Sequence, residues 1–355
     1  MNTIEEIQEA VRASPRLHVR GAGTKSALSG AATHSVAGLS GMVEYNPSEY
    51  TFTAKAGTPV AEINAILANH GQYLPFDPPL AGRGATLGGT IAAGLSGPGR
   101  YRFGGVRDFL LGVQLVTGEG RVVRGGGKVV KNAAGFDLPK LMVGSLGRYG
   151  ILTECTCKVF PRPETTCTIR AEFVSAEAAL EKLCALATAS FDLLCLDAGP
   201  ADTLLLRVGG MRESADARVD RLNAFLGAST HVLTDEEDAQ AWQSAGEFSW
   251  LPKGYGLIKV PINPARILEL EDAAGAMNPA PVRHYSVGGN VCWLGWPNDA
   301  GAEHADAFLK RLNLPGVAVL GSFRQALLGH QTGDAFARRL LSVLDPEQRF
   351  QPYAA

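Results

Sequence analysis

Glycine is concentrated in one stretch of this chain, and this limits what the stretch can fold into. The chain has 355 residues and 42 glycines, of which 19 lie between Gly82 and Gly150. Because glycine has no Cβ, it is favoured where the backbone turns sharply or where another group approaches closely. We therefore expect this stretch to form tight loops that leave main-chain groups accessible.

A first glycine loop precedes this stretch, at residues 20–26 (RGAGTKS), directly after a predicted strand at residues 17–20. Several backbone N–H groups of such a loop can point into one concavity, which suits a pyrophosphate. The hydroxyls of Thr24 and Ser26 add donors, and Arg20 and Lys25 add positive charge. Taken alone, the loop is also compatible with a tight turn that binds nothing.

A Rossmann dinucleotide site is the first alternative for this loop. Ser26 replaces the third glycine of the G-x-G-x-x-G pattern, although Glu44 lies about 20 residues further on, where a ribose-binding acid belongs. Gly30 and Gly38 interrupt the helix that should follow. The pattern therefore disfavours a Rossmann site.

A second glycine motif follows the segment 76–79 (FDPP), at residues 84–94 (GATLGGTIAAG). Thr86 is a suitable N-cap for a short helix. One face of that helix carries only glycine and alanine, so a flat or phosphate-bearing ligand can lie against its backbone. Close packing of the helix on a strand also favours small residues, but two bare loops in one domain favour a large nucleotide cofactor.

The third segment runs from residues 131–138 (KNAAGFDL) to residues 144–154 (GSLGRYGILTE). It is not a P-loop, because neither Lys128 nor Lys131 is followed by the Ser or Thr of the G-K-[ST] pattern.

In order and spacing, the three segments resemble the FAD domain of the vanillyl-alcohol oxidase / p-cresol methylhydroxylase (PCMH-type) flavoproteins, over roughly residues 15–165. Within that superfamily, residues 94–98 (GLSGP), 106–112 (VRDFLLG) and 131–138 resemble the FAD-binding subunits of bacterial glycolate oxidases. The tail, with Asp345, Pro346, Phe350 and Pro352, is similar to the closing segment of the family, which folds back beside the flavin domain.

The resemblance implies a set of FAD-binding residues. Residues 21–25 would hold the pyrophosphate, the second motif would line the flavin and phosphates, and Gly150 with Ile151 would lie on the other side. The complete set is Arg20, Gly21, Ala22, Gly23, Thr24, Lys25, Pro78, Thr86, Leu87, Gly88, Gly89, Ala92, Ala93, Gly150 and Ile151. Members that attach FAD covalently often carry histidine where this chain has Lys25, so the expected cofactor is non-covalent FAD. Leu146 stands where full dehydrogenases of the family usually have glutamate, which argues against independent catalysis.

The expected fold class is α+β, with a two-subdomain PCMH-type FAD-binding domain at residues 1–165. Pro161 and Pro163 mark the boundary. A cap of two ferredoxin-like βαββαβ units is expected at 166–330, as a substrate-like or partner-binding domain. The expected cap elements are strand 166–173, helix 176–189, strands 193–198 and 203–208, helix 213–226, strand 229–233, strand 256–260, helix 264–275, strands 282–287 and 291–296, helix 301–312 and strand 316–320. A C-terminal helix and tail at 331–355 is expected to return to the FAD domain.

The composition of the chain argues against several classes of protein. The formal net charge of −2 gives no broad attraction to nucleic acid or to an anionic membrane. None of the six cysteines forms a C-x-x-C pair, and no histidine pair has zinc-site spacing, so we expect no metal and no iron–sulfur cluster in the chain. The sequence shows neither a signal peptide nor an apolar run long enough to span a bilayer. The expected location is the cytoplasm, with peripheral attachment at the inner membrane through partners left open.

The resemblance implies an FAD-binding subunit of a glycolate oxidase complex, which oxidises glycolate to glyoxylate. Its expected partners are a larger homologous flavoprotein subunit and an iron–sulfur subunit, with a small 2-hydroxy acid as substrate of the complex. Catalytic residues are not assigned. His284, Tyr285 and Arg324 are candidates, although a structural role fits each better, and Lys131 is a candidate for stabilising a reduced flavin. Two alternatives stay open: a self-contained FAD-dependent dehydrogenase for a D-lactate-type 2-hydroxy acid, and a non-catalytic flavin-domain scaffold.

Overall fold

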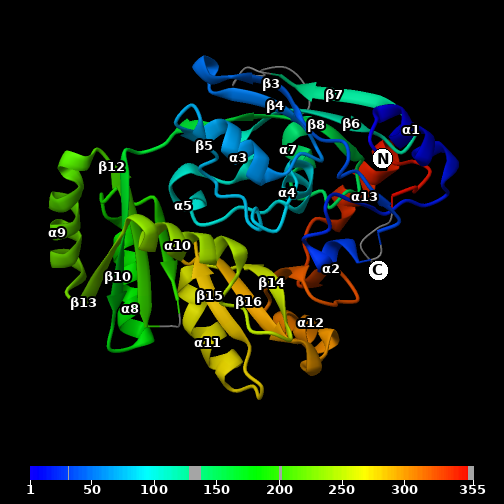
Figure 1. The fold of residues 1–355 in the computed structure, drawn as a ribbon. Coiled ribbons are helices and arrows are strands. Elements are labelled where there is room, and N and C mark those ends of the chain that lie inside the picture. Colours follow the sequence, from blue (N-terminus) through cyan, green and yellow to red (C-terminus); the bar gives the residue numbers. More distant parts are fainter. Residues whose placement is uncertain (31, 128–136, 200–201, 351–355) are drawn as a thin grey trace. The chain divides into compact units, whose positions relative to one another are not determined.

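A computed structural model describes residues 1–30, 32–127, 137–199 and 202–350 (Figure 1). The chain divides into two compact units, each built from helices and strands, in agreement with the predicted fold class. The first unit comprises Met1–Ser96, Gly104–Arg162 and Gln331–Ala355, and the second comprises Gly97–Phe103 and Pro163–His330.

The first unit is built on a five-stranded antiparallel sheet in the order β3-β4-β8-β6-β7. The strands are β3 Met42–Asn46, β4 Thr51–Lys55, β6 Leu110–Val116, β7 Val122–Gly126 and β8 Ile151–Lys158. A hairpin connects β6 to β7, with Gly120 in the turn at φ +73°. Two small pairs complete the strands: β1 Val19–Arg20 with β2 His34–Ser35 in parallel, and β5 Gln72–Tyr73 with β9 Phe160–Pro161 in antiparallel orientation.

Eight short helices belong to the described part of the first unit. They are α1 Ile4–Ala13, α2 Ser26–Ser29, η1 Pro47–Glu49, α3 Val60–Ala68, α4 Leu87–Ala93, α6 Val106–Phe109, α7 Leu138–Met142 and α13 Asp334–Leu344. The C-terminal helix therefore starts three residues later than its expected start at residue 331. Cys155 and Cys157 are both buried along β8.

Thr58 precedes α3 but does not cap it. Pro59 occupies the N-cap position and the helix starts at Val60. The Thr58 hydroxyl instead donates to the carbonyls of Lys55 (2.7 Å) and Gly41 (3.2 Å), and it accepts from the Gly41 N–H (2.9 Å). The hydroxyl therefore fixes the turn between β4 and α3.

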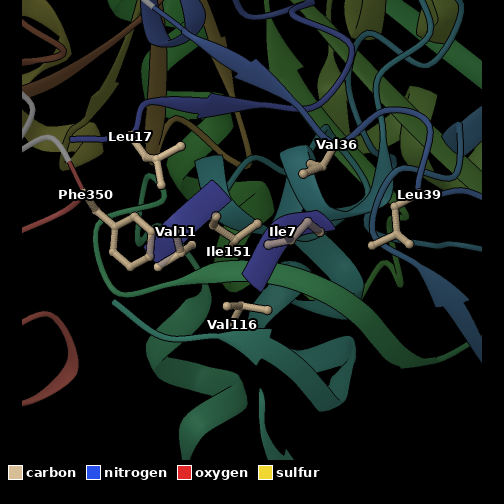
Figure 2. Close-up of a cluster of buried hydrophobic side chains, with 8 residues drawn as sticks. All are labelled: Ile7, Val11, Leu17, Val36, Leu39, Val116, Ile151 and Phe350. Carbon is tan, nitrogen blue, oxygen red and sulfur yellow. The ribbon is translucent and has the colours of Figure 1, made fainter. Parts of the chain in front are cut away.

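One core cluster joins both ends of the chain to the sheet (Figure 2). It consists of Ile7, Val11, Leu17, Val36, Leu39, Val116, Ile151 and Phe350, all buried. Ile7 and Val11 come from α1, which is capped by the Thr3 hydroxyl. Because Phe350 lies in the same cluster, the tail is part of this core.

Polar contacts also hold the tail to α1. Asp345 is buried, and its carboxylate accepts from the N–H groups of Arg349 and Phe350, each at 2.9 Å. The Arg349 guanidinium donates to the carbonyls of Val11 (2.8 Å), Arg12 (3.1 Å) and Ser14 (3.0 Å). A cation at the C-terminus of a helix complements the orphan carbonyls there.

The second unit is built on a nine-stranded antiparallel sheet in the order β13-β10-β12-β11-β15-β16-β14-β17-β18. Its strands are β10 Thr165–Glu172, β11 Cys195–Ala198, β12 Thr203–Gly210, β13 Ser229–Thr234, β14 Tyr255–Pro261, β15 Val282–Ser286, β16 Val291–Pro297, β17 Pro315–Leu320 and β18 Leu327–Gly329. The helices are α5 Arg100–Phe103, α8 Ala176–Thr188, η2 Arg212–Ser214, α9 Ala215–Leu226, α10 Asp235–Glu247, η3 Pro264–Arg266, α11 Ile267–Gly275, η4 Asn298–Ala300 and α12 Ala302–Arg311.

From β10 to β13 and from β14 to β17, the main elements follow the order βαββαβ. In both sets the strands lie in the order fourth, first, third, second, and the sets meet where Ala198 of β11 pairs with Tyr285 of β15.

Helix α10 was not predicted, and neither was strand β18. A helix usually reveals itself by a buried apolar stripe, but Trp242 and Asp238 are the buried residues of α10. The Asp238 carboxylate accepts from Thr166 (2.7 Å), Thr168 (2.6 Å) and Arg207 (2.6 Å). A buried carboxylate is tolerated only with such partners, so polar contacts replace the stripe here.

Residues Gly97–Phe103 group with the second unit, although the sequence analysis placed them in the FAD-binding domain. A Cβ on Gly288 would lie 2.8 Å from the Tyr101 ring, so this ring lies directly against the turn between β15 and β16. Arg102 forms an ion pair with Asp192 at 3.0 Å. These contacts join the segment to the second unit.

Candidate functional site

A cavity in the first unit brings the glycine motifs together. It encloses about 780 Å³ of empty space, including the part that is open to solvent. The predicted residues that line it are Arg20, Gly21, Ala22, Gly23, Thr24, Lys25, Thr86, Gly88, Gly89, Ala92, Ala93, Gly150 and Ile151. Residues 20–25, helix α4 and the start of β8 therefore face one space.

Two predicted residues, Pro78 and Leu87, are not part of this lining. Leu87 is fully buried on the inner side of α4, and Pro78 lies half-buried in the loop before that helix. The lining also contains residues that were not predicted: Val19, Leu28, Ser29, Val36, Ala56, Leu146, Gly147 and Leu152. Val36 and Ala56 belong to none of the glycine motifs, so the sequence does not mark them as site residues. Strand pairing and chain turns bring them to the wall of the cavity.

The loop between β1 and α2 presents unused main-chain donors. Within the described ranges, none of the backbone N–H groups of residues 21–25 donates a hydrogen bond. Gly23 has a φ of +78°, a conformation that favours glycine. A Cβ on Gly21 would overlap the Thr86 hydroxyl, so this glycine lets the loop approach the start of α4. Free N–H groups around a cavity are suited to bind an anion.

Lys25 adds a buried positive charge to this loop. Its side chain is 6% exposed and contacts the Thr24 hydroxyl at 3.5 Å. Burial lowers the pKa of Lys25 from 10.5 to about 8. No carboxylate pairs with it in the part of the chain that the structure describes. A buried cation without a counter-ion is costly, and an anionic group in the cavity would compensate it.

Ligand-free protein should become more stable as the pH rises from about 8 towards 10.5. In this window the unfolded chain keeps the Lys25 proton while the folded protein releases it, because the folded-state pKa is the lower one. Chemical denaturation of wild type and of Lys25→Met at pH 7.5 and pH 10 tests this. The rise attributable to Lys25 should be missing in the variant, and identical pH profiles would contradict it.

Helix α4 contributes a surface and few donors. Thr86 is its N-cap, and the hydroxyl accepts from the Gly89 N–H at 3.3 Å. The N–H groups of Leu87 and Gly88 already donate to the carbonyls of Thr58 (2.9 Å) and Ala56 (2.8 Å). A Cβ on Gly88 would lie 2.7 Å from the Ala56 Cβ. The start of this helix is therefore satisfied by protein, and the free donors lie on residues 21–25.

Replacing Thr86 by alanine should reduce stability by about 1 kcal/mol, the usual contribution of an N-cap hydroxyl. Thr86→Ser keeps the acceptor for the Gly89 N–H and serves as the matched control. Urea unfolding measures both. Equal losses in the two variants would show that the methyl group, and not the cap, is responsible.

Another part of the cavity wall comes from residues 146–152. Leu146 has a φ of 54° and its N–H donates to the Ala92 carbonyl at 2.8 Å. Gly147, at φ +76°, has open space where a Cβ would stand. At Gly150, with φ +149°, a Cβ would lie 2.6 Å from the Leu115 Cδ1. This part of the wall is therefore apolar, and at its glycines no side chain projects into the cavity.

Other predicted features do not join this site. Lys128 and Lys131 lie outside the described residues. His284 is held within the second unit, with its Nε2 3.1 Å from the Asp197 carboxylate and its ring stacked on Trp250 at 5.6 Å. Tyr285 donates to Glu271 at 2.6 Å, and Arg324 is exposed.

The described residues lack the features that two other kinds of site require. They contain no group of three or more His, Cys, Asp or Glu side chains placed to hold a metal ion. They also contain no helix with the length and apolar character needed to cross a bilayer.

Comparison with known proteins relates the first part of the chain to a protein family. Residues 1–126 match the family model described as FAD binding domain (FAD_binding_4). This part of the chain is similar to the FAD-binding domains of that family, and FAD is the cofactor that the cavity has to fit.

Among curated proteins, the chain is similar to glycolate oxidase subunit GlcE of Escherichia coli (42% identical over 181 residues, 50% of this chain and 52% of that protein). It is also similar to glycolate oxidase subunit GlcD of Bacillus subtilis (33% over 140 residues, 39% and 30%). A third relative is the mitochondrial D-lactate dehydrogenase [cytochrome] 1 of Saccharomyces cerevisiae (33% over 143 residues, 40% and 24%). The matches thus span about half or less of each relative.

Among solved structures, that of an alkyldihydroxyacetonephosphate synthase matches with a TM-score of 0.73 and 16% identity, over 99% of this chain and 75% of the other. The likeness extends over both units and shows the shared PCMH-type fold.

The cavity fits FAD by its own chemistry. FAD carries a negatively charged diphosphate and a flat ring system. The open N–H groups of residues 21–25 and the buried ammonium of Lys25 match the diphosphate. Flat groups have room beside helix α4, where the lining residues Gly89, Ala92 and Ala93 are small. They also have room at Gly147, which has open space where a Cβ would stand.

Proposed function

We propose that this protein is the FAD-binding subunit of a glycolate oxidase (glycolate dehydrogenase) complex and contributes to the oxidation of glycolate to glyoxylate. The observation that carries this proposal is the cavity lined by residues 20–25, α4 and residues 146–152. At its cationic end lies the buried ammonium of Lys25, which has no carboxylate partner among the described residues. The similarity to GlcE supports glycolate as the substrate of the complex.

In this proposal the residues of the first unit bind and orient the cofactor. The N–H groups of residues 21–24 and the Lys25 ammonium hold the diphosphate, while Arg20, whose side chain lies over Gly23, adds a second cation at the rim. Bound FAD supplies a two-electron acceptor. Leu146, Ile151 and Leu152 exclude water from the apolar side of the cavity. Because Lys25 cannot form the covalent link that a histidine makes, the cofactor is dissociable.

A subunit role requires partners. Oxidation of glycolate to glyoxylate releases two electrons and two protons, so the electrons must leave the flavin. The described residues offer no cluster of metal ligands. We therefore include in the proposal a larger homologous flavoprotein, similar to GlcD, and an iron–sulfur subunit that receives the electrons. The names of the relatives support an assembly of subunits.

Two measurements on the purified chain test the cofactor. Its absorption spectrum after gel filtration should show flavin bands, and precipitation with acid should release the flavin into the supernatant. A colourless protein that takes up no added FAD would instead support the non-catalytic scaffold. Flavin that stays with the acid pellet would contradict dissociable binding.

The assembly is tested by affinity purification of the tagged chain from its own cell. A second flavoprotein and a cysteine-rich iron–sulfur protein should copurify in constant ratio, and the complex should reduce an artificial acceptor with glycolate. Purification of the chain alone with undiminished flavin and full turnover would contradict the subunit role.

The D-lactate dehydrogenase among the relatives favours one second candidate, a self-contained FAD-dependent dehydrogenase for a D-lactate-type 2-hydroxy acid. It predicts rapid oxidation of D-lactate or glycolate by the isolated chain. It also requires a base and a carboxylate-binding cation in the chain itself.

A further inference from the structure

We propose that helix α13 docks onto a partner subunit of the complex through an exposed apolar ridge of Phe336, Leu340 and Val343, and that the partner's groove carries carboxylates at its rim. This inference rests on the proposed function, because it names the surface through which the flavin subunit joins its partners. The helix belongs to the first unit and is labelled in Figure 1.

Helix α13 differs from the other long helices of the chain in its burial. It has 11 residues, and none of its side chains from Ala335 to Leu344 is buried. Every other helix of eight or more residues in the described ranges buries at least two side chains. A helix this short is marginal in isolation, and packing of its apolar face normally stabilises it. Part of the apolar face of α13 is therefore left uncovered by the chain itself.

The uncovered side chains follow helical spacing. Phe336 is 62% exposed, Val343 is 75% exposed, and Leu340 lies half-buried between them. Residues at positions i, i+4 and i+7 lie along one side of a helix. The same spacing marks the anchor residues of helices that bind in a groove of another protein. Single exposed apolar side chains are common, whereas an aligned set of them indicates an interaction surface.

The C-terminal end of α13 is fixed to the first unit. The Gly118 N–H donates to the Leu344 carbonyl at 3.2 Å. A Cβ on Gly118 would overlap the Asp345 carboxylate, so the hairpin turn between β6 and β7 lies directly against the end of the helix. Asp345 itself is buried and bound by two backbone N–H groups. The ridge is thus held in one orientation before a partner binds, which reduces the ordering cost of association.

Arg338 and Arg339 indicate the charge of the partner. Both side chains are exposed, and the described side chains of α13 include no carboxylate. Neither arginine forms an ion pair with another residue in the part of the chain that the structure describes. Arg339 directly precedes Leu340, so its guanidinium flanks the ridge. Carboxylates at the rim of the receiving groove would complement this positive charge.

The same charges argue against two other occupants of the ridge. In an antiparallel pair of α13 helices centred on Leu340, the Arg339 side chains of both copies would lie on the same side of the seam. Like charges placed together across an interface are unfavourable, so a second copy of this chain is disfavoured. An anionic lipid surface is typically bound by clusters of about 4–8 basic residues. Helix α13 has two, in a chain with a formal net charge of −2.

The apolar part of the surface is tested by affinity purification of the tagged full chain from its own cell. Phe336→Asp and Val343→Asp should each reduce the recovery of the flavoprotein and the iron–sulfur protein, identified by mass spectrometry, about tenfold or more. Val174→Asp, at a side chain of the second unit that is 99% exposed, is the matched control and should recover both proteins like the wild type. Full recovery with both ridge variants would overturn the proposal.

The fold of the variants is checked in the same preparations. The ridge variants should keep the flavin bands and the thermal midpoint of the wild type, because their side chains are exposed. Phe336→Ala removes the ring without adding a charge and should also lower the recovery of both partners. Partner loss that occurs only in variants with a lowered thermal midpoint would count against a direct contact.

The charged part of the surface is tested with two substitutions of one residue. Arg339→Glu reverses the charge beside the ridge and should lower the recovery of the partners, whereas Arg339→Lys keeps the charge and should retain most of it. Arg212→Glu, at an exposed arginine of the second unit, controls for the change in net charge. Equal recovery with Arg339→Glu and Arg339→Lys would refute the acidic rim.

Two measurements on the purified chain without its partners test the other occupants. The chain should sediment as a monomer, and it should not float with vesicles of phosphatidylglycerol and phosphatidylcholine. A dimer that Phe336→Asp dissociates would make a second copy the occupant of the ridge. Vesicle binding that Phe336→Asp abolishes would make a lipid surface the occupant. Either result would overturn the proposal of a partner subunit.

Failure of this inference and failure of the proposed function are distinguishable. Partners that copurify with Phe336→Asp and Val343→Asp as they do with the wild type would refute the ridge and leave the subunit role standing. A wild-type chain that holds neither partner would refute the subunit role, and the docking surface with it.

Discussion

Replacing Lys25 by methionine is expected to weaken FAD binding by about 10- to 100-fold. A hydrogen bond to a charged group contributes about 1.5–3 kcal/mol, and 1.4 kcal/mol corresponds to a tenfold change in Kd. Lys25 lies at the upper end of this range, because its ammonium is buried and has no carboxylate partner among the described residues. The measurement is titration of FAD into ligand-free protein, followed by quenching of flavin fluorescence.

Three variants separate the charge of Lys25 from its packing. Lys25→Met conserves most of the side-chain volume and removes the ammonium, whereas Lys25→Arg retains the charge and should keep more of the affinity. Lys253→Met removes an exposed lysine from the second unit and controls for net charge. Wild-type affinity in Lys25→Met would show that the diphosphate does not meet this ammonium.

The same substitution should have the opposite effect on the ligand-free protein. The shift of the Lys25 pKa from 10.5 to about 8 corresponds to roughly 3 kcal/mol of unfavourable burial of the charge. Lys25→Met removes that cost, so the free energy of unfolding without FAD should increase at pH 7, by up to that amount. A residue that destabilises the empty protein and strengthens ligand binding is typical of a functional site.

How much of this site the sequence predicts depends on how local each signal is. The loop at residues 20–25 and the bare face of α4 are encoded by consecutive small residues, and both line the cavity. Val36 and Ala56 were not found, because pairing of β1 with β2 and the turn after β4 bring them to the wall. Pro78 was included by family likeness, and its loop lies beyond the lining.

The second unit shows the same limit. Alternating strands and striped helices predict most of its elements, because periodicity is a local property. Helix α10 was missed because Asp238 and Trp242 fix it by hydrogen bonds to Thr168 of β10. Such contacts leave no periodic stripe of apolar residues in the sequence.

Truncating Phe350 to alanine is expected to reduce the free energy of unfolding by about 3–5 kcal/mol, the usual cost for a buried phenylalanine. Phe350 is 4% exposed and lies in the cluster that contains Val11 of α1 and Ile151 of β8 (Figure 2). The loss would leave a hole between the tail and the helix. Phe336→Ala, at a phenylalanine of α13 that is 62% exposed, is the matched control and should change stability by about 0.5 kcal/mol or less.

The effect of Phe350→Ala should reach the cofactor, because the cluster and the cavity share a wall. Val36 and Ile151 belong to both, so a cluster that loses Phe350 holds one side of the cavity less firmly. FAD stabilises the folded state by RT ln(1 + [FAD]/Kd), so tighter binding stabilises it more at a given FAD concentration. The rise in the thermal midpoint on adding FAD should therefore be smaller in Phe350→Ala than in Phe336→Ala at equal FAD concentration. An equal rise in the thermal midpoint of both variants would show that the tail stabilises the fold but not the cavity. In that case, loss of Phe350 would not affect FAD binding through the shared residues Val36 and Ile151.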